Sequence, residues 1–198
     1  EAQSRAGTVS DALAIGIDGG EGDDTINSTA TLTVTTLSRA DTTATSSSNT
    51  GFNIAGSSSG ESVADATSNV TASGIGIRGG ISVLDVNESD TDVITNEGAI
   101  TVTTTVSAET SSTSTADSIT FIGEAEGTAV SDASATVLAD GIGIDGGADK
   151  DTITNKNTIT VITTANASVK STSNVDAYTT FGGASSMGVS DASANVLA

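Results

Sequence analysis

One six-residue phrase occurs three times in this 198-residue chain, and it constrains the fold more than any other feature. The copies are Ile15–Gly20, Ile75–Gly80 and Ile142–Gly147, each reading Ile-Gly-Ile-x-Gly-Gly, and they begin 60 and 67 positions apart. Each copy opens a longer block of similar sequence, in which an acidic segment is followed by a Thr-rich segment. Repetition at a fixed phase is the signature of a stacked array, whose units are stable only when a neighbour covers them.

The Thr-rich segments alternate with a period of two, which is typical of a β-strand with one buried face. We expect the threonines at 31, 33 and 35 and at 101, 103 and 105 to face solvent. The run before each phrase alternates too, and in residues 130–147 a face of small residues would let a second layer approach closely. Helical periodicity is absent. The Thr-rich positions expected to point inward are Leu32, Val34, Thr36, Ser38, Ala40, Ile100, Val102, Thr104, Val106, Ala108, Ile159, Val161, Thr163, Ala165 and Ala167.

Composition favours a thin core, because only 35% of the residues are hydrophobic and 2% are aromatic. Ala, Val, Ile and Thr packed between close backbones suit a stack of β-coils. The sequence therefore predicts an all-β parallel β-solenoid (β-helix) built from three repeats of about 60 residues. The expected boundaries are 1–60, 61–128 and 129–187, with 188–198 starting an incomplete fourth repeat.

The length of one coil has two interpretations. If each repeat is one wide coil, equivalent strands stack in register, and we favour this arrangement for that reason. Three coils of about 20 residues per repeat would instead stack unlike strands. Phe52, Phe121 and Phe181 recur at similar places in the repeats, and we expect them to plug the core. A sugar-stacking strip is the alternative role for these rings.

The net charge of −19 disfavours nucleic acid and anionic lipid as partners. No apolar run approaches the roughly 20 residues that cross a bilayer, so membrane insertion is not expected. There is no signal-peptide pattern at Glu1, which indicates a mature or excised segment. Few lysines and no cysteine suit a protein exposed outside a cell, so we expect an extracellular or cell-surface location.

Acidic residues follow each glycine phrase, and they are the candidate metal ligands. Gly19–Asn27 fits the Gly-Gly-x-Gly-x-Asp-x-apolar-x pattern, and Gly146–Thr154 fits it in part, so the chain resembles RTX calcium-binding repeats at these turns. Calcium takes six to eight oxygen ligands, which stacked carboxylates would supply. Solvated Asp-Gly turns are the alternative. The candidate calcium ligands are Asp18, Asp23, Asp24, Asp90, Asp92, Asp145, Asp149 and Asp151.

A broader resemblance covers nearly the whole chain. Gly-Ile-x-x-Gly-Gly, then Asp-Thr-Ile-Thr-Asn, then Thr-Ile-Thr-Val and an Ala/Ser/Thr-rich return resemble the repeats of bacterial autotransporter passengers and large surface adhesins. That resemblance implies an extracellular parallel β-helix. No enzymatic activity is expected, because the chain has no His, no Cys and no nucleophile elbow, and its six basic residues are scattered.

The two ends of the chain repeat an internal element. Val63–Ala66 recurs as Val130–Ala133 and Val189–Ala192, and we expect Val9–Ala12 to be its first copy. No polar capping unit is visible, so the segment either belongs to a longer array or stacks head to tail on other copies of itself into a filament. The residues expected at such a joint are Val9, Asp11, Val189, Asp191, Val196 and Leu197.

The expected function is that of a structural filament subunit or fibre segment. The alternative is a calcium-dependent adhesin module that recognises a host, sugar or ice surface as its ligand. For ice, the observation is the outward Thr-x-Thr ranks, of which the third is interrupted by Ile162.

Overall fold

A computed structural model describes residues 1–80, 91–148 and 150–198 of the chain. Every strand pairing in these ranges is parallel, which confirms the predicted all-β solenoid. One sheet has the order β1-β3-β5-β7 and a second, shorter sheet the order β2-β4-β6. The strands are β1 Ala2–Asp18, β2 Thr25–Ser28, β3 Leu32–Arg78, β4 Val93–Asn96, β5 Ile100–Asp145, β6 Thr152–Asn155 and β7 Ile159–Leu197.

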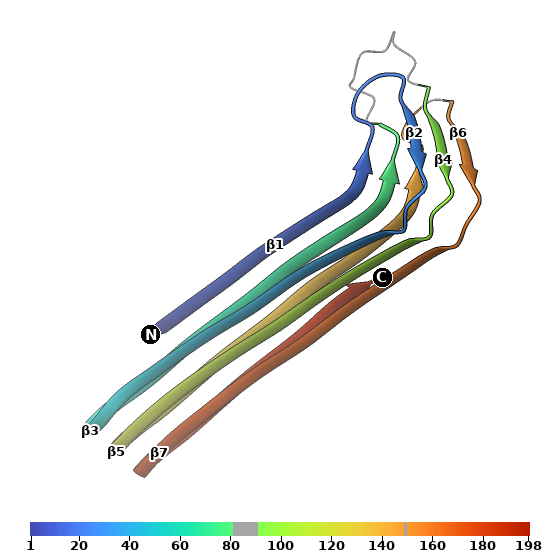
Figure 1. The fold of residues 1–198 in the computed structure, drawn as a ribbon. Helices are drawn as coiled ribbons and strands as arrows, with labels where there is room; N and C mark the ends of the chain where they lie inside the picture. The colour runs from blue at the N-terminus through green and yellow to red at the C-terminus, as the bar shows by residue number, and fades with distance from the viewer. Residues whose placement is uncertain (81–90, 149) are drawn as a thin grey trace.

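Each coil is long and narrow (Figure 1). β3 runs away from the short sheet, reverses at the opposite end and returns, and β5 and β7 follow the same path beside it. We call the end with β2, β4 and β6 the corner, the reversal at residues 49–57, 117–124 and 176–183 the far turn, and the two arms the descending and rising stretches. Leu32 pairs with Ile100, and Ile100 with Ile159, so equivalent positions of successive repeats stack. Each repeat is therefore a single coil of about 60 residues, the arrangement that the sequence favoured.

The alternating pattern decides which side chains are buried. On the descending stretches of β3 and β5 the predicted inward positions are buried, apart from the half-buried Leu32, whereas Thr33 and Thr35 are exposed. On the rising stretch of β5 the small residues are the buried ones, as expected for closely spaced sheets: Ser131, Ala133, Ala135, Val137 and Ala139. The apolar part of the interior lies toward the corner, where Val34, Ile77, Ile94, Ile100 and Val102 form one cluster.

Toward the far turn the interior becomes polar. The Ser112 hydroxyl donates to the Ala64 carbonyl at 2.9 Å and the Ser114 hydroxyl to the Ser62 carbonyl at 2.6 Å, both between a descending and a rising stretch. Ser58 and Ser118 share a hydrogen bond of 2.7 Å between their hydroxyls. Because alanine and serine keep the two arms close together, a hydroxyl on one arm reaches the backbone of the other.

The predicted phenylalanine plugs are wrong. Phe52, Phe121 and Phe181 all lie at the far turn, but they are 65%, 38% and 63% exposed. The interior beside them is occupied by hydrogen-bonded hydroxyls, including Ser118 and Thr120, and so the rings project outward. They contact one another instead, with ring centroids 6.4 and 5.8 Å apart.

The predicted equivalence of Val9–Ala12 with Val63–Ala66 is also wrong. β1 pairs with the rising stretch of β3 so that Gln3 faces Val63 and Val9 faces Asn69. The apolar column that joins Ile15 to Ile75 sets this register, and a one-residue slip would turn its side chains out of the core. Arg5 therefore stands in the column that contains Asp65 in the next coil.

Candidate functional site

The repeated glycine phrase is explained by close packing at the corner. Its second residue lies directly under an apolar side chain of a descending stretch: a Cβ at Gly76 would lie 2.7 Å from Ile100 Cγ2, and one at Gly16 would lie 2.8 Å from Val34 Cγ2. Only glycine leaves the space for these contacts. The phrase therefore marks the point where the two arms meet the corner.

The last two glycines of the phrase accommodate an aspartate and a turn. A Cβ at Gly19 would lie 2.8 Å from Asp24 Oδ2, and one at Gly146 would lie 2.6 Å from Asp151 Oδ2. In the first and third copies the final residue has a positive φ, 103° at Gly20 and 99° at Gly147, a conformation that residues other than glycine rarely adopt. Each carboxylate thus packs onto a glycine backbone of its own coil.

These carboxylates also join the coils. The Asp24 amide donates to Asp92 Oδ1 at 2.8 Å, and the Asp92 amide donates to Asp151 Oδ1 at 3.0 Å. We call Asp24, Asp92 and Asp151 the aspartate ladder. A second contact of the same kind runs from the Thr91 amide to Asp23 Oδ1 at 2.9 Å. A carboxylate that accepts a backbone N–H is a strong, charge-assisted link, so the ladder stabilises the corner.

The predicted calcium ligands differ in burial and in hydrogen bonding. Oδ2 of Asp24 and Oδ2 of Asp92 are buried and have no hydrogen-bond partner among the described residues. Asp90 and Asp149 lie outside the described residues. In the described ranges, no group of three or more His, Cys, Asp or Glu side chains is placed to hold a metal ion. Calcium therefore stays a prediction, which a melting curve with and without a chelator tests.

Asp18 and Asp145 belong to a separate charge column beside the ladder. Arg78 lies between them in register, where the third unit and the first carry aspartate. Its Nη2 is 2.6 Å from Asp18 Oδ2 and its Nε is 3.1 Å from Asp18 Oδ1. This hydrogen-bonded pair lowers the pKa of Asp18 and raises the pKa of Arg78. The arginine therefore places a positive charge between the two aspartates of a column that would otherwise contain only like charges.

The short sheet contains an asparagine ladder that was not predicted from the sequence. Asn96 is fully buried, and its Nδ2 donates to Asn155 Oδ1 at 2.8 Å and to the Gly98 carbonyl at 2.6 Å. The sequence contained a signal for this ladder, because the β4 and β6 segments both end in Thr-Asn, which places the two asparagines at equivalent positions of the repeat. In the first coil Ser28 occupies the same column.

The predicted joint residues lie mostly on the outer surface. Val9, Asp11, Val189, Asp191 and Leu197 occupy outward positions of β1 and β7. Val196 alone is in a core column, where it follows Val70 and Val137.

Comparison of the chain with protein families, with curated proteins and with solved structures gave no match. The resemblance to autotransporter passengers, adhesins and RTX repeats thus stays a prediction. Residues 1–80, 91–148 and 150–198 contain no helix with the length and hydropathy needed to cross a membrane.

Proposed function

We propose that this chain is a non-catalytic structural segment of an extracellular fibre or filament, which extends by stacking further coils on its ends. The observation that carries the proposal is the exposed apolar cross-section at the C-terminal end. Val102 is fully buried and Val137 is 1% exposed in the middle of the stack, but their equivalents Val161 and Val196 are 40% and 45% exposed. The end of the rod presents core side chains that another coil would bury.

The unpaired strand edges support the same function. Nothing among the described residues pairs with the outer edge of β1 or of β7. Long exposed edges are templates for adding another strand. Stiffness would come from ladders that pass without interruption from β1 through β3 and β5 to β7.

Charge also favours one way of stacking two copies. Asp65, Asp132 and Asp191 form one column on the outer surface of the rising stretches, and Arg5 stands at its first position, 3.2 Å from Asp65. If β1 of a second copy paired with the end of β7 in the same register, its Arg5 would meet Asp191. The arginine would then separate two like-charged runs at every joint.

The joint would be shorter than the contacts inside one chain. Residues 2–11 of one copy would face 188–197 of the next. The descending stretches of the two copies would not pair, because a gap the width of one strand would remain between them. This follows from the strand levels, since the rising side has one more than the descending side. The rising stretches are 2–18, 62–78, 129–145 and 188–197, and the descending ones are 32–49, 100–117 and 159–176. We therefore expect association that depends on concentration.

Complementary charge variants test the joint. R5D and D191R should each abolish self-association, because each places like charges together. An equimolar mixture of the two should associate again into alternating stacks, because the β1 edge of each chain then meets an opposite charge on the β7 edge of the other. Sedimentation velocity measures the species, and electron microscopy of wild-type protein should reveal rods longer than one chain. Wild-type protein that stays monomeric at all concentrations would contradict self-stacking. The proposal would then hold only in its other form, in which the chain is one segment of a longer array of coils.

A further inference from the structure

The far turn carries an exposed apolar surface that stacking of coils does not use. We propose that it binds a cationic, amphipathic segment of another protein. All four aromatic residues of the chain lie there. We call this surface the aromatic belt, and its residues are Phe52, Ile54, Phe121, Ile122, Tyr178 and Phe181.

Exposure of the belt does not result from the open ends of the rod. The middle coil has neighbours on both sides, yet Phe121 is 38% exposed and Ile122 is 50% exposed. In the same coil Val102 and Val106 are fully buried. The belt would therefore remain exposed in a stack of any length, and contiguous exposed apolar surface of this kind marks interaction sites.

The interior of the far turn has no space in which the rings of the belt could be buried. Ser58, Ser118 and Thr120 fill the space behind it, and the Ser58 hydroxyl lies 2.7 Å from that of Ser118 and 2.6 Å from that of Thr120. Burying a ring there would break hydrogen bonds between buried groups, which costs about 1–3 kcal/mol for each group left without a partner. The outward position of the rings is thus built into the turn.

The ring geometry favours a peptide over a sugar. Phe52 and Phe121 are tilted by 49°, and Phe121 and Phe181 meet edge to face at 86°. A row of sugar rings would need aromatic faces presented side by side in one plane. Rings at these angles present edges as well as faces, and apolar peptide side chains can contact both.

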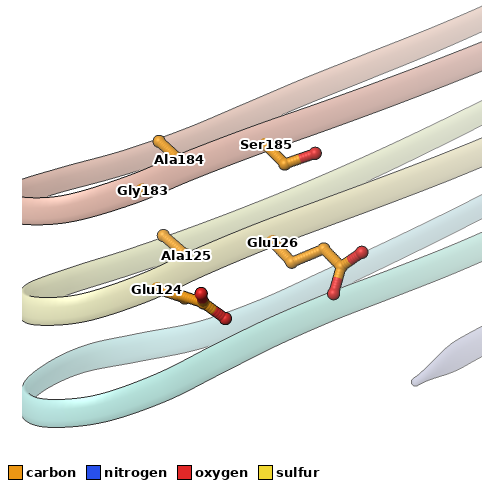
Figure 2. Close-up of a pocket in the computed structure, with 6 residues that line it drawn as sticks. All are labelled: Glu124, Ala125, Glu126, Gly183, Ala184 and Ser185. Atoms are coloured by element: carbon orange, nitrogen blue, oxygen red, sulfur yellow. The ribbon is translucent and has the colours of Figure 1, made fainter.

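Carboxylates border the belt on both arms. Asp117 and Asp176 are in register on the descending side, and Glu124 and Glu126 follow the turn on the rising side. Figure 2 shows Glu124 and Glu126 projecting from β5 beside Gly183 and Ser185 of β7, where the surface has a hollow of about 260 Å³. The ion pairs found in the described part of the chain do not involve these four carboxylates. A second copy placed belt to belt would bring like charges together, so the complementary partner is cationic.

The test uses the full chain and a designed probe. The probe is an 18-residue amphipathic helix of leucine and lysine, and its control has glutamate at every lysine position. Fluorescence anisotropy should give binding of the lysine peptide only. F121S/F181S should weaken it at least about tenfold, as loss of aromatic anchors does. E124Q/E126Q should weaken it and reduce its salt dependence.

Matched variants separate the belt from general attraction to an acidic protein. Leu37 is 69% exposed on the outer surface of β3, and L37S should leave the affinity unchanged. D132N/D140N removes two carboxylates from the outer surface of the rising stretch and should have a smaller effect than E124Q/E126Q. Equal effects of the belt and control variants, or equal binding of the glutamate peptide, would overturn the proposal. So would Phe121-dependent binding of dextran without binding of the lysine peptide.

Discussion

The corner half and the far-turn half of each coil share one backbone ladder but have different interiors. Near the corner, Ile77, Ile94 and Ile100 pack in an apolar cluster. Near the far turn, Ser112, Ser114 and Ser118 are fully buried, and their hydroxyls hydrogen-bond to backbone carbonyls of other stretches. The same architecture is therefore held by hydrophobic burial at one end and by hydrogen bonds between the arms at the other.

The difference shows why so few hydrophobic residues suffice. In-register parallel pairing satisfies the backbone along the whole coil, so the interior has only to fill a narrow space without leaving polar groups unpaired. Serine does this where the arms are closest, since its hydroxyl bonds the opposite backbone. The buried isoleucines lie at the corner, where the short sheet widens the coil, and valine with alanine fills the next part of the interior.

The largest effect is expected from Ile94→Ala, which tests the corner half. Ile94 is fully buried, and truncation of such a residue costs about 2–5 kcal/mol of unfolding free energy. Ile153 occupies the same column in the end coil and is 46% exposed, so I153A should cost clearly less. S114A in the hydroxyl half should cost about 1 kcal/mol, the worth of one hydrogen bond. Urea denaturation followed by circular dichroism measures all three. Equal losses for I94A and S114A would break the contrast between the halves.

A smaller effect is expected from two buried threonines with different hydrogen bonding. Thr104 Oγ1 has no partner among the described residues, whereas Thr110 donates to Ser68 Oγ at 2.8 Å. T104V removes an unsatisfied hydroxyl from the apolar half and should stabilise the fold by up to about 1 kcal/mol. T110V should destabilise it by about 1–2 kcal/mol, because it leaves Ser68 short of a partner. Urea midpoints of the two variants should therefore move in opposite directions, and a shift in the same direction would contradict this account.

The sequence predicted the stacking well, because the necessary information is local. A two-residue period identifies the strands, and a repeated phrase fixes which positions align, so the inward column that joins Val34 to Val102 was predicted correctly. The first copy of Val-x-Asp-Ala was misplaced, since four common residues specify a register less well than the isoleucine column at Ile15 and Ile75.

Positions that depend on how the chain reverses were not predictable in this way. The burial of Phe121 depends on the space left inside the far turn, which the hydroxyls of Ser118 and Thr120 occupy. The stacking of Asp24, Asp92 and Asp151 followed from the repeat, but the capture of their carboxylates by backbone amides of the adjacent coil did not. That contact depends on the rise between coils and on the angle at the corner.

The smallest effect concerns acid, which should act on a single ion pair of the corner half. Arg78 lowers the pKa of Asp18 below its ordinary value of 3.8, so the pair contributes stability above pH 3.8 and loses it as the pH falls through the lower value of the folded state. Both side chains are partly exposed, and solvent screening limits the contribution to about 1 kcal/mol or less. D18N should therefore lower the urea midpoint slightly at pH 7, and this difference from the wild type should shrink as the pH falls below 3.8 and Asp18 becomes protonated. D176N at the far turn is the control, since the ion pairs in the described ranges do not include Asp176. If D176N lowered the urea midpoint at pH 7 as much as D18N does, the ion pair with Arg78 would not be the cause of the stability that Asp18 contributes.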